Sequence, residues 1–224
     1  DIIITEFFFN KSAGNLPEYV ELFNKTESTI NLEYWKLDID GIQVEIDVTF
    51  NIAPQDYVVI LSSSGLFHSE DGTTYCSSSN YGFPFNVCDV TVDELFWRIG
   101  TFSDLSNTSG SITIWDNSDT PNVIDSVAYS AETNFPVGDD IIGMAAEFIQ
   151  NPLLDSTHLL NDIGENWQSS QNPSEWLWNG SSHDYGSPLS VGLYSFGCTD
   201  PYASNYDPDA NNDDGSCEVY GIPL

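Results

Sequence analysis

The sequence predicts an all-β protein built on an antiparallel β-sandwich. Three observations lead to this prediction. Apolar and polar residues alternate with a period of two in several runs, these runs are rich in Val, Ile, Thr, Tyr and Phe, and turn-forming residues separate them. No window has the apolar spacing of an amphipathic helix of three turns. Many short strands joined by turns are typical of a sandwich.

Six runs of residues are expected to form strands. Each has a strand-like composition, and turn-forming residues lie between them. The six runs are residues 2–9, 18–23, 42–48, 57–61, 111–115 and 123–129. The last two flank residues 116–122, which predicts a hairpin with a long loop. A short helical turn is expected in each of the ranges 92–97 and 156–163.

Two long stretches exceed what a minimal sandwich needs. Residues 62–105 are rich in Ser, Gly and aromatic residues, and residues 130–190 carry several Trp residues among Asn, Ser and Pro. Loops of this length without secondary structure are uncommon unless they are functional or cross-linked. We therefore expect long loop insertions on the sandwich, the first of them cross-linked by a pair of cysteines.

The net charge of the chain is extreme for a folded protein. There are 35 Asp and Glu residues against four Lys and Arg residues, which gives −31 at pH 7. Binding to nucleic acid or to an anionic membrane surface needs basic residues, so the composition argues against both classes of partner. A hydrophobic content of 40% and an aromatic content of 13% argue against a disordered acidic tail. No apolar run is long enough to span a membrane.

The four cysteines indicate an oxidising compartment. Cys76 and Cys88 are 12 positions apart, Cys198 and Cys217 are 19 apart, and neither pair forms a CxxC motif. Two local disulfides, Cys76–Cys88 and Cys198–Cys217, are the simplest of the three connectivities, and four buried free thiols are the alternative. Disulfides favour a secreted or cell-surface protein. The strand-like run directly after Asp1 is consistent with a mature chain after cleavage of a leader.

Six short motifs follow one another in the order of a known family. They include IITEF at residues 3–7, EYVELFN at 18–24 and VIDSVAY at 123–129. The others are residues 31–37, 50–61 and 105–114. Together they resemble the lamin-tail domain, an immunoglobulin-like module found in nuclear lamins and in many secreted bacterial and archaeal proteins. The resemblance implies an immunoglobulin-like antiparallel β-sandwich over residues 1–192, an interaction or targeting role and no catalytic activity.

The remaining residues, 193–224, are expected to form a separate acidic unit with a C-terminal tail. Residues 197–217, GCTDPYASNYDPDANNDDGSC, resemble an acidic repeat of secreted surface proteins of marine bacteria. That repeat is similar to the calcium-binding type 3 repeat of thrombospondin. The resemblance therefore implies a small calcium-binding appendage that follows the sandwich.

The residues of this acidic unit also favour calcium by their own spacing. Oxygen-bearing side chains recur at every second position, and calcium takes about six to eight oxygen ligands. Counted as an EF-hand loop, the expected ligands are Asp207, Asp209, Asn211, Asp213 and Glu218, with Asp200 as an additional acid. The Cys198–Cys217 bond would close the unit. The alternative is a solvated acidic linker that binds no metal.

Motifs of the common enzyme classes are missing from the sequence. His68, His158 and His183 are widely spaced with no HExxH pattern, and the GxSxG, SxxK, P-loop and GxGxxG motifs do not occur. Glu18 and Glu21 lie three apart in a predicted strand and point to opposite faces, so they cannot flank one scissile bond. The sequence therefore predicts a protein without enzymatic activity.

We expect a non-enzymatic structural or adhesion protein of the extracellular space or cell surface, stabilised by calcium. The expected partners are further copies of the chain, in a filament or surface array, or other surface proteins. A free N-terminal strand and an open sheet edge would favour strand pairing between subunits. The alternative is a glycan-binding module in which Trp176 and Trp178 lie on one side of an extended segment, although Trp residues more often fill a core.

Overall fold

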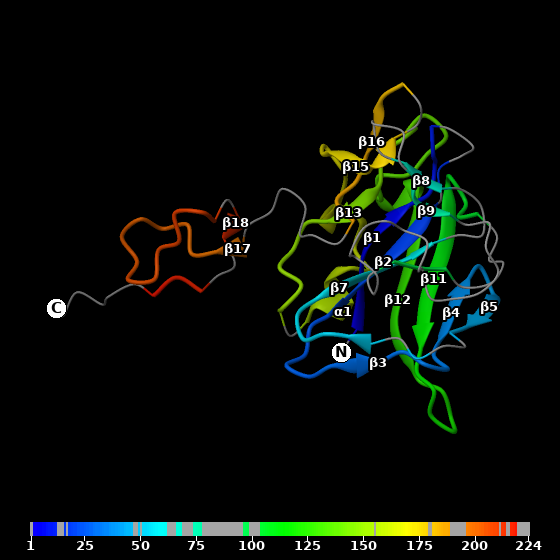
Figure 1. Ribbon diagram of the computed structural model, residues 1–224. Helices are drawn as coiled ribbons and strands as arrows, with labels where there is room; N and C mark the ends of the chain where they lie inside the picture. The colour runs from blue at the N-terminus through cyan, green and yellow to red at the C-terminus, as the bar shows by residue number, and fades with distance from the viewer. Residues whose placement is uncertain are drawn as a thin grey trace.

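The protein is an all-β molecule, as the sequence predicts (Figure 1). The computed structural model describes residues 2–12, 16, 18–46, 49, 51–61, 66–68, 74–77, 96–98, 104–154, 156–178, 181–188, 196–210, 212–213 and 216–218. Residues 66–68, 74–77, 96–98, 175–176, 178, 196 and 212 are described by their backbone alone. Within these residues, no helix has the length and apolar character needed to cross a membrane.

The larger sheet has six strands, and the N-terminal strand lies in its interior. In spatial order the strands are β10 (Phe96–Arg98), β7 (Tyr57–Leu61), β2 (Tyr19–Asn24), β1 (Ile2–Phe8), β13 (Ala146–Phe148) and β14 (Trp167–Ser169). β1 pairs antiparallel with β2 on one side and with β13 on the other. The expectation of a free N-terminal strand is therefore wrong, because hydrogen bonds to neighbours already occupy both edges of β1.

The second sheet has four antiparallel strands and contains the predicted hairpin at residues 116–122. Its spatial order is β12 (Val123–Ser130), β11 (Ser109–Trp115), β4 (Lys36–Ile39) and β5 (Ile42–Glu45). β4 and β5 are joined by Asp40 and Gly41, whose φ angles of 52° and 83° suit the primed turns that join two strands tightly. β11 and β12 are joined by the long loop, in which Asp116 accepts hydrogen bonds from the backbone N–H groups of Ser118 and Asn122.

The main core lies between these two sheets. Buried and more exposed residues alternate along β4, β11 and β12, and the buried apolar ones, such as Ile114, face the larger sheet. A cluster of rings closes the core, with ring centroids 4.7 Å apart for Phe7 and Tyr129 and 5.3 Å apart for Phe7 and Trp167. Phe148 lies 5.5 Å from the ring of Trp167. Such burial is the dominant favourable contribution to folding.

β1 and β2 are buried on both faces, because a third layer covers part of the outer face of the larger sheet. Every residue of both strands is buried. The third sheet runs in the order β16 (His183–Tyr185), β15 (Pro173–Trp178), β8 (Leu66–His68) and β9 (Thr74–Ser77). In it the two long insertions meet, since β8 and β15 pair in parallel at His68 and Leu177 (Figure 1).

Shorter elements complete the sandwich. They are β3 (Ile30–Asn31) with β6 (Asn51–Ile52), two 3₁₀ turns at Ala131–Thr133 and Gly164–Asn166, and α1 (Thr157–Leu160). α1 confirms the helical turn expected in residues 156–163. The turn expected in residues 92–97 is wrong at 96–97, which belong to β10, and residues 92–95 lie outside the described part of the chain. Short apolar runs do not distinguish helix from strand locally, and here pairing with β7 decides.

Candidate functional site

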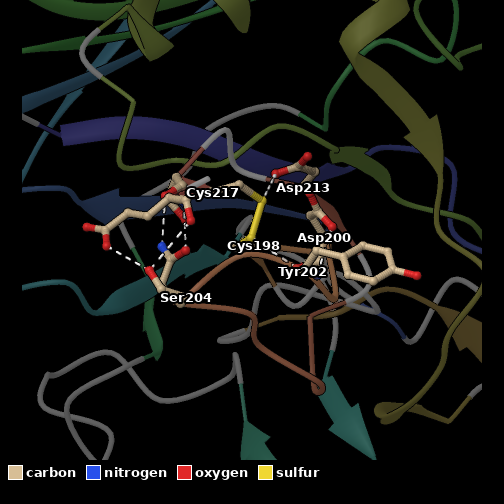
Figure 2. Close-up of a disulfide and its surroundings, with 9 residues drawn as sticks. Cys198, Asp200, Tyr202, Ser204, Asp213 and Cys217 are labelled. Carbon is tan, nitrogen blue, oxygen red and sulfur yellow. Dashed lines mark hydrogen bonds between the residues drawn. A yellow bond between two sulfur atoms is a disulfide. The ribbon is translucent and has the colours of Figure 1, made fainter. Parts of the chain in front are cut away.

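Residues 196–218 form a small unit that lies apart from the sandwich in Figure 1. Its two short strands, β17 (Phe196–Gly197) and β18 (Asn212–Asp213), pair in parallel. The Cys198–Cys217 disulfide spans the unit with a Cα–Cα distance of 4.7 Å, which confirms the predicted pairing (Figure 2). The other predicted pair, Cys76 with Cys88, falls outside the described side chains and stays a prediction.

Two Asp residues shape the backbone of this unit through local turns. An oxygen of Asp200 accepts a hydrogen bond of 2.9 Å from the backbone N–H of Tyr202, and an oxygen of Asp207 accepts one of 2.9 Å from the N–H of Asp209. Side chains of Asp commonly bond the backbone two residues on in this way. Each turn engages one carboxylate oxygen, so the second oxygen of each Asp is not needed to form it.

The end of the unit is tied back to its first turn. The backbone N–H of Glu218 donates to the side-chain oxygen of Asn205 at 2.8 Å, and the amide of Asn205 donates to the carbonyl of Ser216 at 2.7 Å. The hydroxyl of Ser204 donates to Oε2 of Glu218 at 3.0 Å (Figure 2). The described side chains of the unit are thus held together mainly by the disulfide and by hydrogen bonds, since Cys198 and Ala203 are the buried hydrophobic residues among them.

The structure places most of the predicted calcium ligands at the surface of this unit. Asp209, Asp213 and Glu218 are exposed, and Asp200 and Asp207 are partly exposed. Asn211 lies outside the described residues. Within the described part of the chain, no three His, Cys, Asp or Glu side chains lie together as a metal site. The predicted ligands that are accessible all carry carboxylates, a donor set that suits a hard cation such as calcium.

The charges of this unit have no basic counterpart in its own sequence. The four basic residues of the chain all lie before residue 99, and its three His residues all lie before residue 184. The carboxylates of this unit, which contains no Lys, Arg or His, are balanced by cations from solution. The chemistry of the unit therefore fits a divalent cation, although only the sequence spacing assigns individual ligands.

The predicted glycan platform falls in β15. Trp176 and Trp178 both lie in this strand, so the segment is extended as the prediction required. Their side chains lie outside the described part of the structure. The platform therefore remains a prediction that rests on the backbone alone.

A row of buried carboxylates crosses the outer face of the larger sheet, and sequence analysis did not find it. Glu6 in β1 is in register with Glu21 in β2 and with Glu147 in β13. Their exposed fractions are 1%, 1% and 4%. Ser187, which follows β16, places its hydroxyl 2.6 Å from Oε2 of Glu6 and 2.7 Å from Oε1 of Glu147. Tyr19 donates a further hydrogen bond to Glu6.

Burial raises the pKa values of this row. The pKa of Glu6 is raised to about 7, first by desolvation and then by the charge of Glu147. Desolvation also raises the pKa of Glu147 and raises that of Tyr19 well above its usual value. The only sign of this row in the sequence is one Glu inside each of the three apolar segments that form β1, β2 and β13. Sequence alone does not bring these segments into register.

Two further carboxyls are buried singly in the sandwich. Glu18 accepts a hydrogen bond from the backbone N–H of Leu105 and lies 3.6 Å from the ammonium of Lys11, and burial still raises its pKa to about 8. Asp125 accepts bonds from the N–H of Ile4 at 2.8 Å and from the amide of Asn161 at 2.6 Å, and burial raises its pKa to about 6. Both connect loops or strands of the sandwich.

The fold defines an immunoglobulin-like β-sandwich, a class of module that is structural or mediates protein interactions. The family model of the lamin tail domain matches residues 1–141. The chain therefore belongs to the lamin tail domain family, as the six motifs indicate. Searches of curated proteins and of solved structures find no match. The family match does not reach residues 197–217, so their resemblance to the thrombospondin repeat remains an expectation.

Proposed function

We propose that this protein is a calcium-stabilised structural or adhesion component of the extracellular space or cell surface, without enzymatic activity. The observation that carries the proposal is the terminal unit. Its disulfide-closed loop carries exposed carboxylates and contains no Lys, Arg or His. Its attachment to an interaction module of the lamin tail domain family supports a structural role over a catalytic one.

Calcium is the cation that this unit suits best. The ligands are oxygen atoms on flexible loops, and calcium accepts irregular sets of carboxylate oxygens more readily than magnesium does. The Asx turns at Asp200 and Asp207 fix the backbone while leaving one oxygen of each carboxylate for a further contact. We expect calcium to draw these side chains together, with an affinity in the extracellular range of about 10⁻⁴–10⁻³ M.

The disulfide supports a location outside the cell, because such bonds persist mainly in oxidising compartments. The net charge of −31 has a consequence for assembly in the same setting. Two copies of the chain repel one another unless cations lie between them. Calcium would lower this repulsion and so favour a filament or surface array.

The surface for such assembly is best sought at one edge of the sheet formed by β12, β11, β4 and β5. β5 is an edge strand, and its Ile42 is 50% exposed. Unpaired backbone groups at a sheet edge can hydrogen-bond with a strand of another chain. Because β1 is already paired on both sides, the edge of β5 replaces the N-terminal strand in the assembly hypothesis.

A calcium titration followed by nuclear magnetic resonance tests the proposed site. Backbone amide signals of residues 198–218 should shift on addition of millimolar CaCl₂, and those of the sandwich should stay in place. The double variant Asp207→Asn/Asp209→Asn should lose these shifts. Asp139→Asn/Asp140→Asn removes the same charge from exposed positions of the sandwich and should keep them. Shifts spread over the whole surface, unaffected by the first variant, would contradict a dedicated site.

Sedimentation velocity tests assembly separately. Larger species in calcium that disappear in EDTA would support a filament or array. A monomer in both conditions would remove the assembly hypothesis and leave the calcium site untouched.

A glycan-binding module is the second candidate, favoured by the extended β15 that carries Trp176 and Trp178. Alternate residues of a strand point to the same side, so two neighbouring rings would form a platform for sugars. Quenching or enhancement of Trp fluorescence by neutral or acidic oligosaccharides should then be lost in Trp176→Ala/Trp178→Ala. No fluorescence change across a broad glycan panel would exclude this function.

A further inference from the structure

The hydroxyl of Ser187 lies between two buried carboxyl groups. It is 2.6 Å from Oε2 of Glu6 and 2.7 Å from Oε1 of Glu147, and the backbone N–H of Ser187 lies 2.9 Å from Oε1 of Glu6. Both glutamates come from the larger sheet, whereas Ser187 comes from the segment that follows β16. The three groups therefore join the third layer to the sandwich.

The number of hydrogens decides the protonation state of this contact. A Ser hydroxyl carries one hydrogen, so Ser187 donates to one of the two carboxyls. The second short O–O contact needs a hydrogen of its own, because two oxygens that offer only lone pairs repel each other at this distance. That hydrogen must sit on Glu6 or Glu147. The pair consequently holds one proton more than two ionised glutamates would.

We propose that Glu6, Ser187 and Glu147 form a proton-dependent latch that fastens residues 183–187 to the outer face of the larger sheet. With one shared proton, a continuous chain of hydrogen bonds runs from one carboxyl through Ser187 to the other. Loss of that proton leaves two adjacent buried charges and one hydrogen for two contacts. Water must then enter or Ser187 must move away, and either change loosens the segment.

The other titratable groups around the latch are two tyrosines and a further glutamate. Tyr19 from β2 and Tyr57 from β7 interact electrostatically with Glu6, and Glu21 from β2 acts on both tyrosines. Both Tyr hydroxyls stay protonated, because burial raises their pKa values, and the hydroxyl of Tyr19 donates to Glu6, which favours the charged carboxylate. Among the described residues, no basic group enters the interactions that set the pKa of either Glu6 or Glu147. Burial and the charge of Glu147 therefore favour the bound proton, and the hydrogen bonds from Tyr19 and Ser187 offset these two effects only in part.

The position of the latch explains what its opening would release. Residues just before Ser187 have other anchors: Asp184 accepts a hydrogen bond of 2.9 Å from the N–H of Ser12, and the N–H of Tyr185 donates to the carbonyl of Gly143 at 2.7 Å. These contacts involve no shared proton. We therefore expect loosening confined to Ser187 on deprotonation, with the sandwich remaining folded.

The direction in which pH opens the latch follows from the raised pKa values of Glu6 and Glu147. A carboxyl whose pKa is higher in the folded state than in the unfolded state keeps its proton over an intermediate pH range only when folded. The latch is closed at mildly acidic pH, and it opens as the pH rises through neutrality. This proposal does not depend on calcium, and its test is performed in EDTA.

Protonation of the two carboxyls is followed through the carboxyl ¹³C chemical shifts of labelled Glu residues as the pH is varied. One titration in the neutral range, assigned to the pair and shifted to lower pH in Glu147→Gln, is the expected result, because the variant removes the charge of Glu147 and leaves Glu6 buried. Titration of both carboxyls in the ordinary Glu range would overturn the proposal.

Opening of the latch is measured by hydrogen exchange at the backbone amide of Ser187, which donates to Glu6 when the latch is closed, corrected for the intrinsic exchange rate. Protection should fall by about tenfold between roughly pH 5.5 and pH 8.5 in the wild type, whereas β11 and β12 stay protected. In Glu147→Gln the amide can donate to Ser187 at every pH, so the dependence should vanish. Glu45→Gln, at an exposed position of β5, is the matched control and should behave as the wild type. Equal protection at both pH values in the wild type would overturn the latch.

Discussion

Carboxyl groups are used in opposite ways in the sandwich and in the terminal unit. In the sandwich, Glu6 and Glu147 are buried and bonded to neutral donors, and burial raises their pKa values. In the terminal unit, Asp209, Asp213 and Glu218 are exposed. The same chemical group therefore serves as a protonated internal contact in one region and as an accessible acidic surface in the other.

The difference follows from what holds each region together. The sandwich has a large apolar core, which outweighs the cost of enclosing a few carboxyls and shifts their protonation instead. Among the described side chains of the terminal unit, Cys198 and Ala203 are the buried apolar ones, and the unit is held by a disulfide and by turns made by its own Asp side chains. A region of this kind gains most from a cation that binds only its folded form.

The largest effect should come from opening a cavity in the aromatic core. Phe7→Ala removes a fully buried ring that contacts Tyr129 and Trp167, so we expect the free energy of unfolding to fall by about 3–5 kcal/mol. Tyr202→Ala removes a ring that is 89% exposed and should change it by less than about 0.5 kcal/mol. Urea denaturation followed by Trp fluorescence measures both. Equal losses would contradict the contrast between the two regions.

Removal of the disulfide should act on the terminal unit alone. Cys198→Ser/Cys217→Ser frees a loop with a sequence separation of 19, which in the chain-entropy model costs the unit about 3 kcal/mol. We expect rapid proteolysis within residues 198–217 and an unchanged melting temperature of the sandwich. The variant is preferable to a reducing agent, which would also act on Cys76 and Cys88. A lower melting temperature of the sandwich would show that the two regions are energetically coupled.

The buried carboxyl of Glu18 should contribute to the pH dependence of stability. Its pKa is raised from 4.5 to about 8, so between these values the folded state holds a proton that the unfolded state has released. Stability therefore falls as pH rises through this window, by at most about 1.4 kcal/mol per pH unit for this one group, and levels off above it.

Glu18→Gln should flatten this part of the profile, because the amide keeps an acceptor for the N–H of Leu105 and does not titrate. Urea denaturation at several pH values measures the slope. Glu45→Gln, at an exposed position in β5, serves as the control and should leave the slope unchanged. Identical slopes for wild type and Glu18→Gln would show that this carboxyl does not titrate in the window.

Local patterns in the sequence were enough to predict six strands, the hairpin at residues 116–122 and the Cys198–Cys217 bond. The six strands are β1, β2, β5, β7, β11 and β12. These patterns did not predict the third sheet, because its β8 and β15 come from two separate insertions that pair over a long distance in sequence. Alternation tells which residues share a face within one strand. It does not tell which strand lies beside another.

The same limit explains why the buried carboxyls were missed. Glu6 and Glu147 are neighbours only through the register of β1 with β13, and Ser187 reaches them from a third segment. The candidate calcium unit was easier to predict, because its acidic residues and both cysteines lie within one short stretch of sequence. There, spacing along the chain already determines proximity.

Isothermal titration of the full chain with calcium tests the central claim most directly. We expect saturable heat with a dissociation constant of about 10⁻⁴–10⁻³ M, abolished in Asp207→Asn/Asp209→Asn and retained in Asp139→Asn/Asp140→Asn. That result would assign calcium binding to the exposed carboxylates of the terminal unit. Absence of heat in the wild type, or equal heat in all three proteins, would contradict the account.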